Sequence, residues 1–405
     1  MRKLRTLLVT FVLMYICLLP VGAAEGDFVV SLEIGNPIMR VNGIETEIDP
    51  NRGTKPIVVD GRTLVPIRAI IEGLGGRVLW IEETETVVLI LNDEQIQLNI
   101  DEKTALVNGK EKSLDVEPRV INQRTMIPVR FVAEGLGLGV AWDDDSQTVF
   151  VVKNSFEHEE YERLMKAVPE YFGVARVEIN GNKPFFEDYE IIGASFEYYG
   201  QLDGIGRCDV GFASVGKDIM PTTPRGSISS VTPTGWQSVV YRGVIDGDYL
   251  YNRCHLIAHQ LTGENANKRN LITGTRYLNI EGMLPFENKV FDYIEKTGNH
   301  VMFRSTPVFS EGNLVADGVL LEGYSVEDKG EGICFCVYCY NVQPGVRVDY
   351  STGDSTFVGT SFDVYRTPSG KRYHSNPDCG GRNSYGTSIE DAQNAGLTPC
   401  QKCVK

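Results

Sequence analysis

Asn252-Arg253-Cys254-His255, near the middle of a chain of 405 residues, is the stretch on which the expected fold depends. The residues before it, 237–251, favour strands on both sides of an Asp246-Gly247 turn, which predicts a β-hairpin. An Asn-rich loop follows it, and then a helix that Pro285 opens and Gly298 ends. The sequence therefore predicts two strands with a histidine at their end, then a loop and a helix.

The side chains in and after this stretch suit the hydrolysis of phosphodiester bonds. His255 supplies an imidazole, whose unperturbed pKa of about 6.5 lets it deprotonate water at neutral pH. Asn279 offers a carbonyl oxygen, the kind of ligand that hard cations such as Mg²⁺ prefer. Arg253 offers a guanidinium that can hold the negative charge of a phosphate. Together these groups predict a site for metal-assisted cleavage of nucleic acid.

On these motifs, the chain from about residue 200 to 352 resembles the DNA/RNA non-specific endonuclease family, which has the ββα-metal fold, and within it the DNA-entry and secreted streptococcal-type nucleases. The family's Asp-Arg-Gly-His segment matches residues 252–255. The resemblance implies that the histidine is the general base and that Mg²⁺ or Mn²⁺ is the metal ion. It implies that His255, Arg253 and Glu287 are the catalytic residues. It also implies that Asn279 binds the metal ion and that Asn270 and Asn252 support the site.

Two residues depart from the family pattern. Asn252 stands where the family has Asp, so it keeps hydrogen bonding but loses a charge, and Cys254 stands where the family has Gly. A small Cys is tolerated unless the backbone at that position needs a positive φ. Neither change removes the base or the metal ligand, so the resemblance still implies an active enzyme.

An internal repeat occupies the first third of the chain. Residues 61–68 recur as 123–130, and the match continues to Trp80 and Trp142. Each copy predicts a short strand, a helix begun by Pro and ended by Gly, and a pair of strands. Because neither copy is large enough to bury its own apolar face, two copies packed as one α+β domain are expected.

The repeat resembles the copper amine oxidase N-terminal-like domain over residues 36–152. This segment contains neither His nor Cys, so no copper chemistry is expected from it. Its expected role is that of a stalk, for spacing or for attachment to a cell wall or surface.

The first 24 residues, 1–24, have the order of a secretory signal peptide. Basic residues precede an apolar run, 7–19, and small residues end the segment at Ala24. The run is shorter than the roughly 20 residues that a membrane-spanning helix needs, and no later stretch of the sequence is expected to span a bilayer. The protein is therefore expected outside the cytoplasm, secreted after cleavage or held at the cell surface if the segment is retained.

The last segment, 362–405, is expected to be a small separate module. Cys400 and Cys403 have the spacing of a zinc knuckle, and His374 and Cys379 would complete a tetrahedral set. A zinc ion with these four ligands would be structural, and a disulfide from Cys379 to Cys400 or Cys403 is the alternative. The module resembles short Cys-rich tails of bacterial secreted nucleases and surface proteins.

The whole chain is expected to be α+β. After the two-repeat stalk domain comes a ββα-metal nuclease domain over 156–350, with a central antiparallel sheet and helices, and then a Ser/Thr/Gly-rich linker over 351–361. Within the nuclease domain, Cys334 and Cys336 share one face of a predicted buried strand and Cys339 lies on the other. This alternation favours packing over metal binding.

Net charge limits the kind of nucleic-acid binding that is expected. The chain carries −15, and residues 155–355 hold 17 basic and 28 acidic side chains, a balance of −11. A tight non-specific binder would carry a basic stripe, so weak, transient binding with turnover is expected. DNA is the expected substrate and RNA an additional one. The alternatives are a surface adhesin that keeps the fold only to bind nucleic acid, and a nuclease toxin delivered to competitors.

Overall fold

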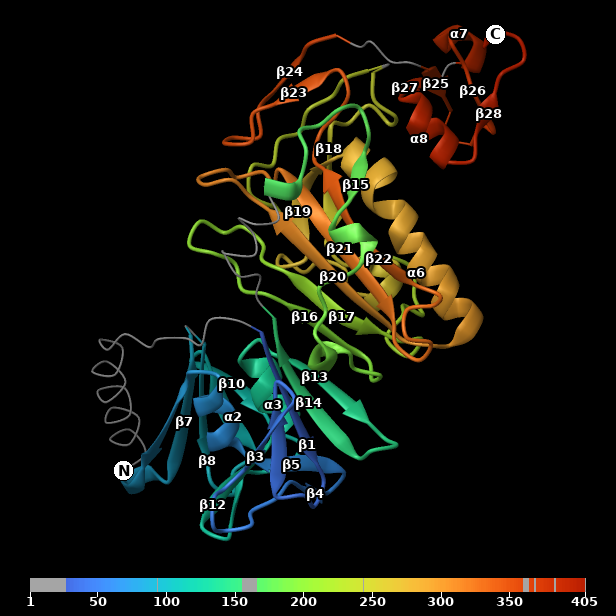
Figure 1. Ribbon diagram of the computed structural model, residues 1–405. Helices are drawn as coiled ribbons and strands as arrows, with labels where there is room; N and C mark the ends of the chain where they lie inside the picture. The colour runs from blue at the N-terminus through green and yellow to red at the C-terminus, as the bar shows by residue number, and fades with distance from the viewer. Residues whose placement is uncertain are drawn as a thin grey trace. The chain divides into compact units, whose positions relative to one another are not determined.

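The computed structural model describes residues 27–92, 94–154, 166–242, 244–359, 364–367, 369–381 and 384–404. The chain divides into two compact units, Met1–Ser155 with Asp188–Glu190, and Phe156–Glu187 with Ile191–Lys405 (Figure 1). The signal segment predicted at 1–24 lies outside the described residues. Within the described ranges, no helix is both long and apolar enough to cross a bilayer.

The first unit contains two copies of one pattern of strand, helix, strand and strand. In the first copy the elements are β5 (Arg62–Pro66), α2 (Ile67–Gly73), β6 (Arg77–Ile81) and β7 (Thr86–Leu91). In the second copy they are β12 (Arg124–Pro128), α3 (Val129–Gly135), β13 (Gly139–Asp143) and β14 (Thr148–Lys153). The order of elements that the repeat predicts is confirmed.

The strands of the first unit form three sheets, in the orders β13-β14-β1-β2-β3, β10-β9-β8-β7-β6 and β11-β12-β5-β4, and the last of these joins the two copies. Their other strands are β1 (Phe28–Glu33), β2 (Ile38–Val41), β3 (Ile44–Glu47), β4 (Ile57–Val59), β8 (Glu94–Asn99), β9 (Thr104–Val107), β10 (Lys110–Ser113) and β11 (Arg119–Ile121). β5 pairs with β12, with Val65 opposite Ile127, and one core includes Ile70 from the first copy and Val132 from the second. The prediction of a single packed domain is confirmed.

A six-stranded antiparallel sheet forms the centre of the second unit (Figure 1). Its order is β15-β22-β21-β20-β17-β16, with β15 (Arg176–Glu178), β16 (Phe196–Tyr199), β17 (Gly211–Val215), β20 (Val301–Val308), β21 (Gly318–Ser325) and β22 (Cys334–Tyr340). In β22, Cys336 and Cys339 are buried free thiols that belong to different core clusters, one on each face. The predicted packing role of these cysteines is confirmed.

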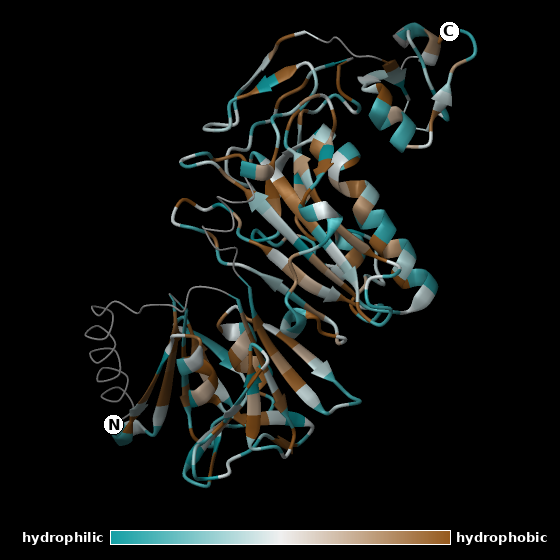
Figure 2. Ribbon diagram, in the orientation of Figure 1, coloured by the Kyte–Doolittle hydropathy of each residue, from teal (hydrophilic) through white to brown (hydrophobic). Residues whose placement is uncertain are grey.

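Helix α6 (Leu284–Thr297) covers one face of this sheet. Its residues Val290 and Ile294 are fully buried in the same core cluster as Phe303 and Phe335 of the sheet. Figure 2 shows apolar and polar residues alternating around α6, as expected for a helix with one buried face. The helix ends at Gly298, whose left-handed φ of 75° suits glycine, so the predicted helix end is confirmed.

The histidine predicted at the end of a strand pair lies in β18 (Tyr251–His255), which pairs antiparallel with β19 (Leu271–Thr275). This is not the pairing that the sequence predicted. Within the described part of 237–251, the expected hairpin is reduced to one bridge between Val240 and Tyr249. The amide of Val244 donates to the carbonyl of Tyr241, and this turn ends the first arm early. The partner of β18 is therefore the segment that follows the Asn-rich loop.

The segment predicted as a linker, 351–361, contains sheet in its described part. β24 (Ser355–Phe357) pairs antiparallel with β23 (Val346–Val348). Residues 360 and 361 lie outside the described residues. The composition of 351–361 indicated a flexible chain, but backbone pairing with β23 orders its middle.

The tail consists of very short elements, β25 (Val364–Arg366), β26 (Arg372–Tyr373), α7 (Pro377–Gly380), β27 (Tyr385–Thr387), α8 (Ile389–Asn394) and β28 (Thr398–Pro399). β25 pairs with β27, and β26 pairs in parallel with β28. Within the second unit, Arg366 of the tail forms an ion pair with Glu281 at 3.2 Å, and Tyr277 donates a hydrogen bond to Asp391.

Candidate active site

A cleft with a volume of about 710 Å³ opens along β18 in the second unit. It brings together five of the six residues predicted for the nuclease site, which are Asn252, Arg253, His255, Asn279 and Glu287. The sixth, Asn270, does not line the cleft. Residues from β18, from the turn of helix after β19 and from the start of α6 thus meet around one cavity.

His255 is the last residue of β18 and is only 6% exposed. Its Nε2 lies 2.8 Å from the backbone carbonyl of Asn265, which can only accept a hydrogen bond, so Nε2 carries the proton. The lone pair is therefore on Nδ1, which lies 3.3 Å from Nη2 of Arg225. Burial lowers the pKa of His255 to about 4, against the opposing effect of the Asn265 carbonyl. At neutral pH the imidazole is neutral and can accept a proton.

Asn270 holds the loop behind His255 in place. Its side chain is fully buried, and its Oδ1 accepts a hydrogen bond from the amide of Ile257 at 2.8 Å. Its Nδ2 donates to the carbonyl of the same residue at 3.0 Å. The two bonds join the start of β19 to the chain just after β18.

Asn279 lies in a short π-helix, Leu278–Met283, directly before α6. Its Nδ2 donates to Oδ1 of Asn252 at 3.1 Å, which turns the amide so that its own Oδ1 is available to a cation. Asn252 also accepts from Nη1 of Arg276 at 3.2 Å, while Arg276 pairs with Asp246 at 3.0 Å. This chain of contacts fixes the Asn279 side chain. π-Helical turns are frequent at functional sites.

Glu287 lies in the first turn of α6 and is 7% exposed. Burial raises the pKa of Glu287 to about 8, and the positive charge of Arg225 acts in the opposite direction. A divalent cation in the cleft would favour the carboxylate form. Glu287 and Asn279 thus offer oxygen donors of the kind that Mg²⁺ and Mn²⁺ bind.

Arg253 is largely engaged with the protein itself. Its Nε donates to the carbonyl of Val231 at 2.6 Å, and its guanidinium stacks over the ring of Trp236 at 4.1 Å. The arginine nearest to the imidazole is instead Arg225, which the sequence analysis missed. Arg225 lies 30 residues before His255 in a loop without a recognisable pattern, and no signal in the sequence marks it.

Two protein families match parts of the chain. Residues 188–326 match the DNA/RNA non-specific endonuclease family. The chain carries a DNA/RNA non-specific endonuclease domain. Residues 41–151 match the copper amine oxidase N-terminal domain. Both predicted resemblances are confirmed, and the endonuclease domain makes the protein a nucleic-acid hydrolase.

Solved structures of nucleases are similar to the chain. NucA from Streptococcus agalactiae with magnesium bound is 21% identical over 50% of this chain and 97% of NucA, with a TM-score of 0.43. Sda1 nuclease with bound zinc is 25% identical over 47% of this chain and 98% of Sda1, with a TM-score of 0.35. An extracellular endonuclease is 20% identical over 46% of this chain and all of its own length, with a TM-score of 0.32. No curated protein matches the chain.

The endonuclease domain accommodates the cysteine that replaces the family's glycine. Cys254 lies in the extended strand β18, so the position does not need a positive φ. Its side chain is buried against Gly274 of the neighbouring strand. A Cβ on Gly274 would lie 2.4 Å from Sγ of Cys254, so only glycine leaves room for the thiol. Burial raises the pKa of Cys254, which is therefore a neutral packing group.

Proposed function

We propose that the endonuclease domain hydrolyses phosphodiester bonds in DNA and, without selecting the sugar, in RNA. His255 is the general base, and one Mg²⁺ or Mn²⁺ ion is bound through Asn279. The observation that supports this proposal is that His255 and Asn279 line the same cleft, one with an unprotonated Nδ1 beside Arg225 and the other with an oriented amide oxygen.

Each residue of the cleft has a separate proposed role in hydrolysis. His255 Nδ1 takes a proton from the attacking water, because Nε2 already carries the proton that it donates to Asn265. The cation, when bound, neutralises negative charge on the phosphate. Asn252 keeps the Asn279 amide in its orientation.

Arg225 is proposed to hold the phosphate. Its guanidinium lies beside the nitrogen that acts as base, where negative charge develops in the transition state. Arg253, which sequence comparison assigned to this task, is proposed to shape the cleft wall through Val231 and Trp236. Glu287 is proposed to accept hydrogen bonds from water bound to the cation.

The net negative charge of residues 155–355 supports an enzyme that cleaves and releases nucleic acid over a protein that only binds it. A purely binding protein would favour a basic surface, whereas the region 155–355 carries −11 from its 17 basic and 28 acidic side chains. An enzyme needs positive charge only where the scissile phosphate lies.

We propose that the protein is secreted or held at the cell surface, with the stalk domain as spacer or attachment module. For the tail we propose zinc, because the thiolates of Cys379, Cys400 and Cys403 are soft ligands that favour this ion.

Cleavage of supercoiled plasmid tests the proposal. The purified chain should convert the plasmid to nicked and linear forms with Mg²⁺ or Mn²⁺ and should stop when EDTA is added. A His255→Ala variant should lose activity by about 10²–10⁴-fold, the usual contribution of a general base. His300→Ala is the matched control, because His300 pairs with Glu327 and does not line the cleft. Full activity of His255→Ala would exclude this residue as the base, and binding without cleavage in every metal would favour the adhesin.

A further inference from the structure

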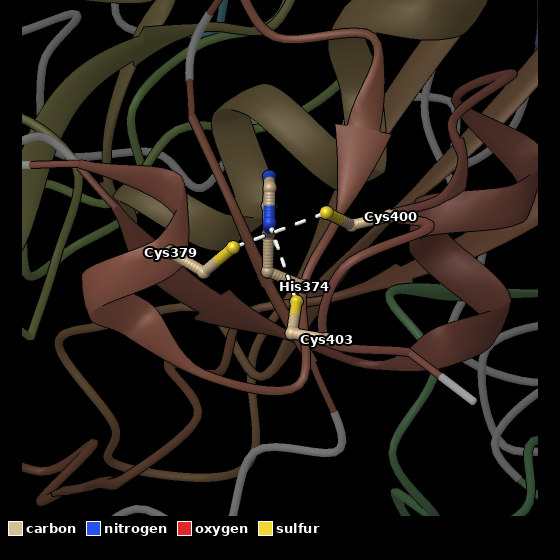
Figure 3. A group of neighbouring side chains, drawn as sticks. All are labelled: His374, Cys379, Cys400 and Cys403. Atoms are coloured by element: carbon tan, nitrogen blue, oxygen red, sulfur yellow. Dashed lines mark hydrogen bonds between the residues drawn. The ribbon is translucent and has the colours of Figure 1, made fainter.

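Four potential metal ligands meet in the tail. Nδ1 or Nε2 of His374 and the Sγ atoms of Cys379, Cys400 and Cys403 all lie within 4.8 Å of one another. Figure 3 shows the three sulfur atoms arranged around the imidazole. Cys379 and Cys400 are 3.9 Å apart at sulfur, and Sγ of Cys403 lies 3.5 Å from Nδ1 of His374.

The backbone of the tail produces this cluster. β26 and β28 run in parallel, with Tyr373 opposite Pro399, so His374 and Cys400 are the next residues on adjacent strands. The amide of Cys400 donates to the carbonyl of Tyr373 at 2.9 Å, which fixes this register. The turn after Cys400 brings Cys403 back to the same side, with the amide of Val404 donating to Cys400 O at 3.0 Å.

The fourth ligand comes from a separate element. Cys379 lies in the short helix α7, whose first turn is capped by the side chain of Asn376, which accepts from the amide of Asp378 at 2.9 Å. The amides of Lys402 and Cys403 donate to the sulfur of Cys400, which fixes this side chain toward the cluster. The donors thus come from three separate segments that the fold directs at one point.

The separations fit a tetrahedral zinc site and not a disulfide. With Zn–S near 2.3 Å and Zn–N near 2.0 Å, a tetrahedral site separates its ligand atoms by roughly 3.5–3.8 Å. Two of the separations, 3.5 and 3.9 Å, agree with this spacing, and the others are no longer than 4.8 Å. A disulfide brings two sulfur atoms to about 2.05 Å, and all three cysteines are free thiols.

We propose that the tail binds one Zn²⁺ ion through Nδ1 of His374 and the thiolates of Cys379, Cys400 and Cys403, and that the ion holds the tail together. Three soft thiolates and one imidazole select zinc over the hard cations that suit the nuclease cleft. Four protein ligands leave no coordination position for water or substrate, so the ion is structural.

The small apolar core explains why the tail needs a metal. Its buried apolar cluster consists of Val364, Tyr373, Ala392 and Leu397, with Val404 partly buried against it. A module of fewer than fifty residues with so few buried side chains is below the size at which packing alone usually suffices. Metal binding then supplies free energy of folding directly, because the unfolded segment has no preformed site.

Metal content of the full chain, purified under reducing conditions, is the first test. One zinc per chain is expected, and Cys403→Ser should lower the zinc content to near zero. Cys334→Ser makes the same chemical change in β22, outside the cluster, and should keep the zinc. A Cys403→His variant should also keep it, since imidazole is a zinc ligand. Retention of a full zinc in Cys403→Ser, or a chain without zinc, would refute the proposal.

Cobalt substitution gives a readout that does not depend on nuclease activity. Co²⁺ in place of zinc should give thiolate-to-metal charge-transfer absorption and the visible bands of a tetrahedral site, and Cys403→Ser should weaken both. Thiol counting in the zinc-free chain should find all tail cysteines reduced. A disulfide within the tail of the native, oxidised protein would overturn the proposal. None of these results depends on plasmid cleavage, so failure here and failure of the proposed nuclease function are separate findings.

Discussion

The cleft and the tail contrast two ways of using histidine with a metal. In the cleft, Nε2 of His255 donates a hydrogen bond to the backbone carbonyl of Asn265, Nδ1 is the proposed base, and amide and carboxylate oxygens are the proposed donors to a hard cation. In the tail, His374 directs Nδ1 at Sγ of Cys403, among three thiols that can fill every coordination position. The two sites differ in the type of ligand atom and in whether a coordination position stays open for water or substrate. These two properties distinguish a catalytic metal ion from a structural one.

The two sites also differ in what holds their residues in place. The cleft residues stand on β18, the π-helical turn and α6, which are packed against the core of a six-stranded sheet. The tail has only a few buried side chains of its own. Removing a metal should therefore abolish chemistry in the first case and structure in the second. Four predictions test this contrast.

The largest effect is expected from Asn279→Ala in the cleft. Loss of the amide oxygen should lower kcat/KM for plasmid cleavage by about a hundredfold or more and raise the Mg²⁺ concentration needed for half-maximal rate. Asn288→Ala is the matched control, because Asn288, which is on α6 and accepts a hydrogen bond from Gln260, does not itself line the cleft. Equal activity of the two variants would remove Asn279 from the metal site.

The next effect concerns pH. Burial lowers the pKa of His255 to about 4, so the neutral base persists as the pH falls. At pH 5 about nine-tenths of the imidazole is neutral, against about three per cent for an unperturbed histidine. His255 should therefore cause no loss of kcat/KM between pH 7.5 and 5.

Any loss of kcat/KM in that range should come from Glu287. Burial raises its pKa to about 8 before a cation binds, and a bound cation would shift that pKa downward, into the range between pH 7.5 and 5. Glu287→Gln should abolish such a limb of the pH profile. A limb near pH 6.5 that survives in Glu287→Gln would show that His255 titrates as an ordinary exposed imidazole.

A smaller gain is expected from Asn252→Asp. Oδ1 of Asn252 accepts from both Asn279 and Arg276, and a carboxylate would make both hydrogen bonds charge-assisted. The affinity for Mg²⁺ should rise by about threefold to tenfold, within the range of effects known for residues that orient metal ligands. Metal titrations of the cleavage rate measure it. A lower affinity in Asn252→Asp would show that the amide, not the carboxylate, is required.

The smallest effect on cleavage is expected from removing zinc from the tail. A zinc-selective chelator in excess Mg²⁺ should change the plasmid cleavage rate by about twofold at most, because every residue that lines the cleft lies between Arg225 and Glu287. The same treatment should make the tail sensitive to protease. A large loss of cleavage would show that contacts such as Arg366 with Glu281 transmit the state of the tail to the cleft.

Sequence reasoning predicted residues that the structure brings together at both sites, but it did not predict all of the geometry. The cleft contains five of the six predicted residues, and the tail cluster contains all four. It missed Arg225 and paired β18 with the wrong segment. Turn and strand signals are local, whereas the choice of partner strand depends on which distant segment completes the core. The Gly274 that makes room for Cys254 could be identified only once the two strands were paired.

The sequence by itself determined most of the regular elements and which residue types are available for chemistry. The repeat, the α6 boundaries and the ligand spacing Cys400 to Cys403 depend on local patterns of residue type, and those patterns are present in the unfolded chain. Only the tertiary structure decided which nitrogen of His255 carries the proton, because that depends on the carbonyl of Asn265, ten residues away. Burial likewise set the protonation of His255 and Glu287, since desolvation exists only after the core has formed.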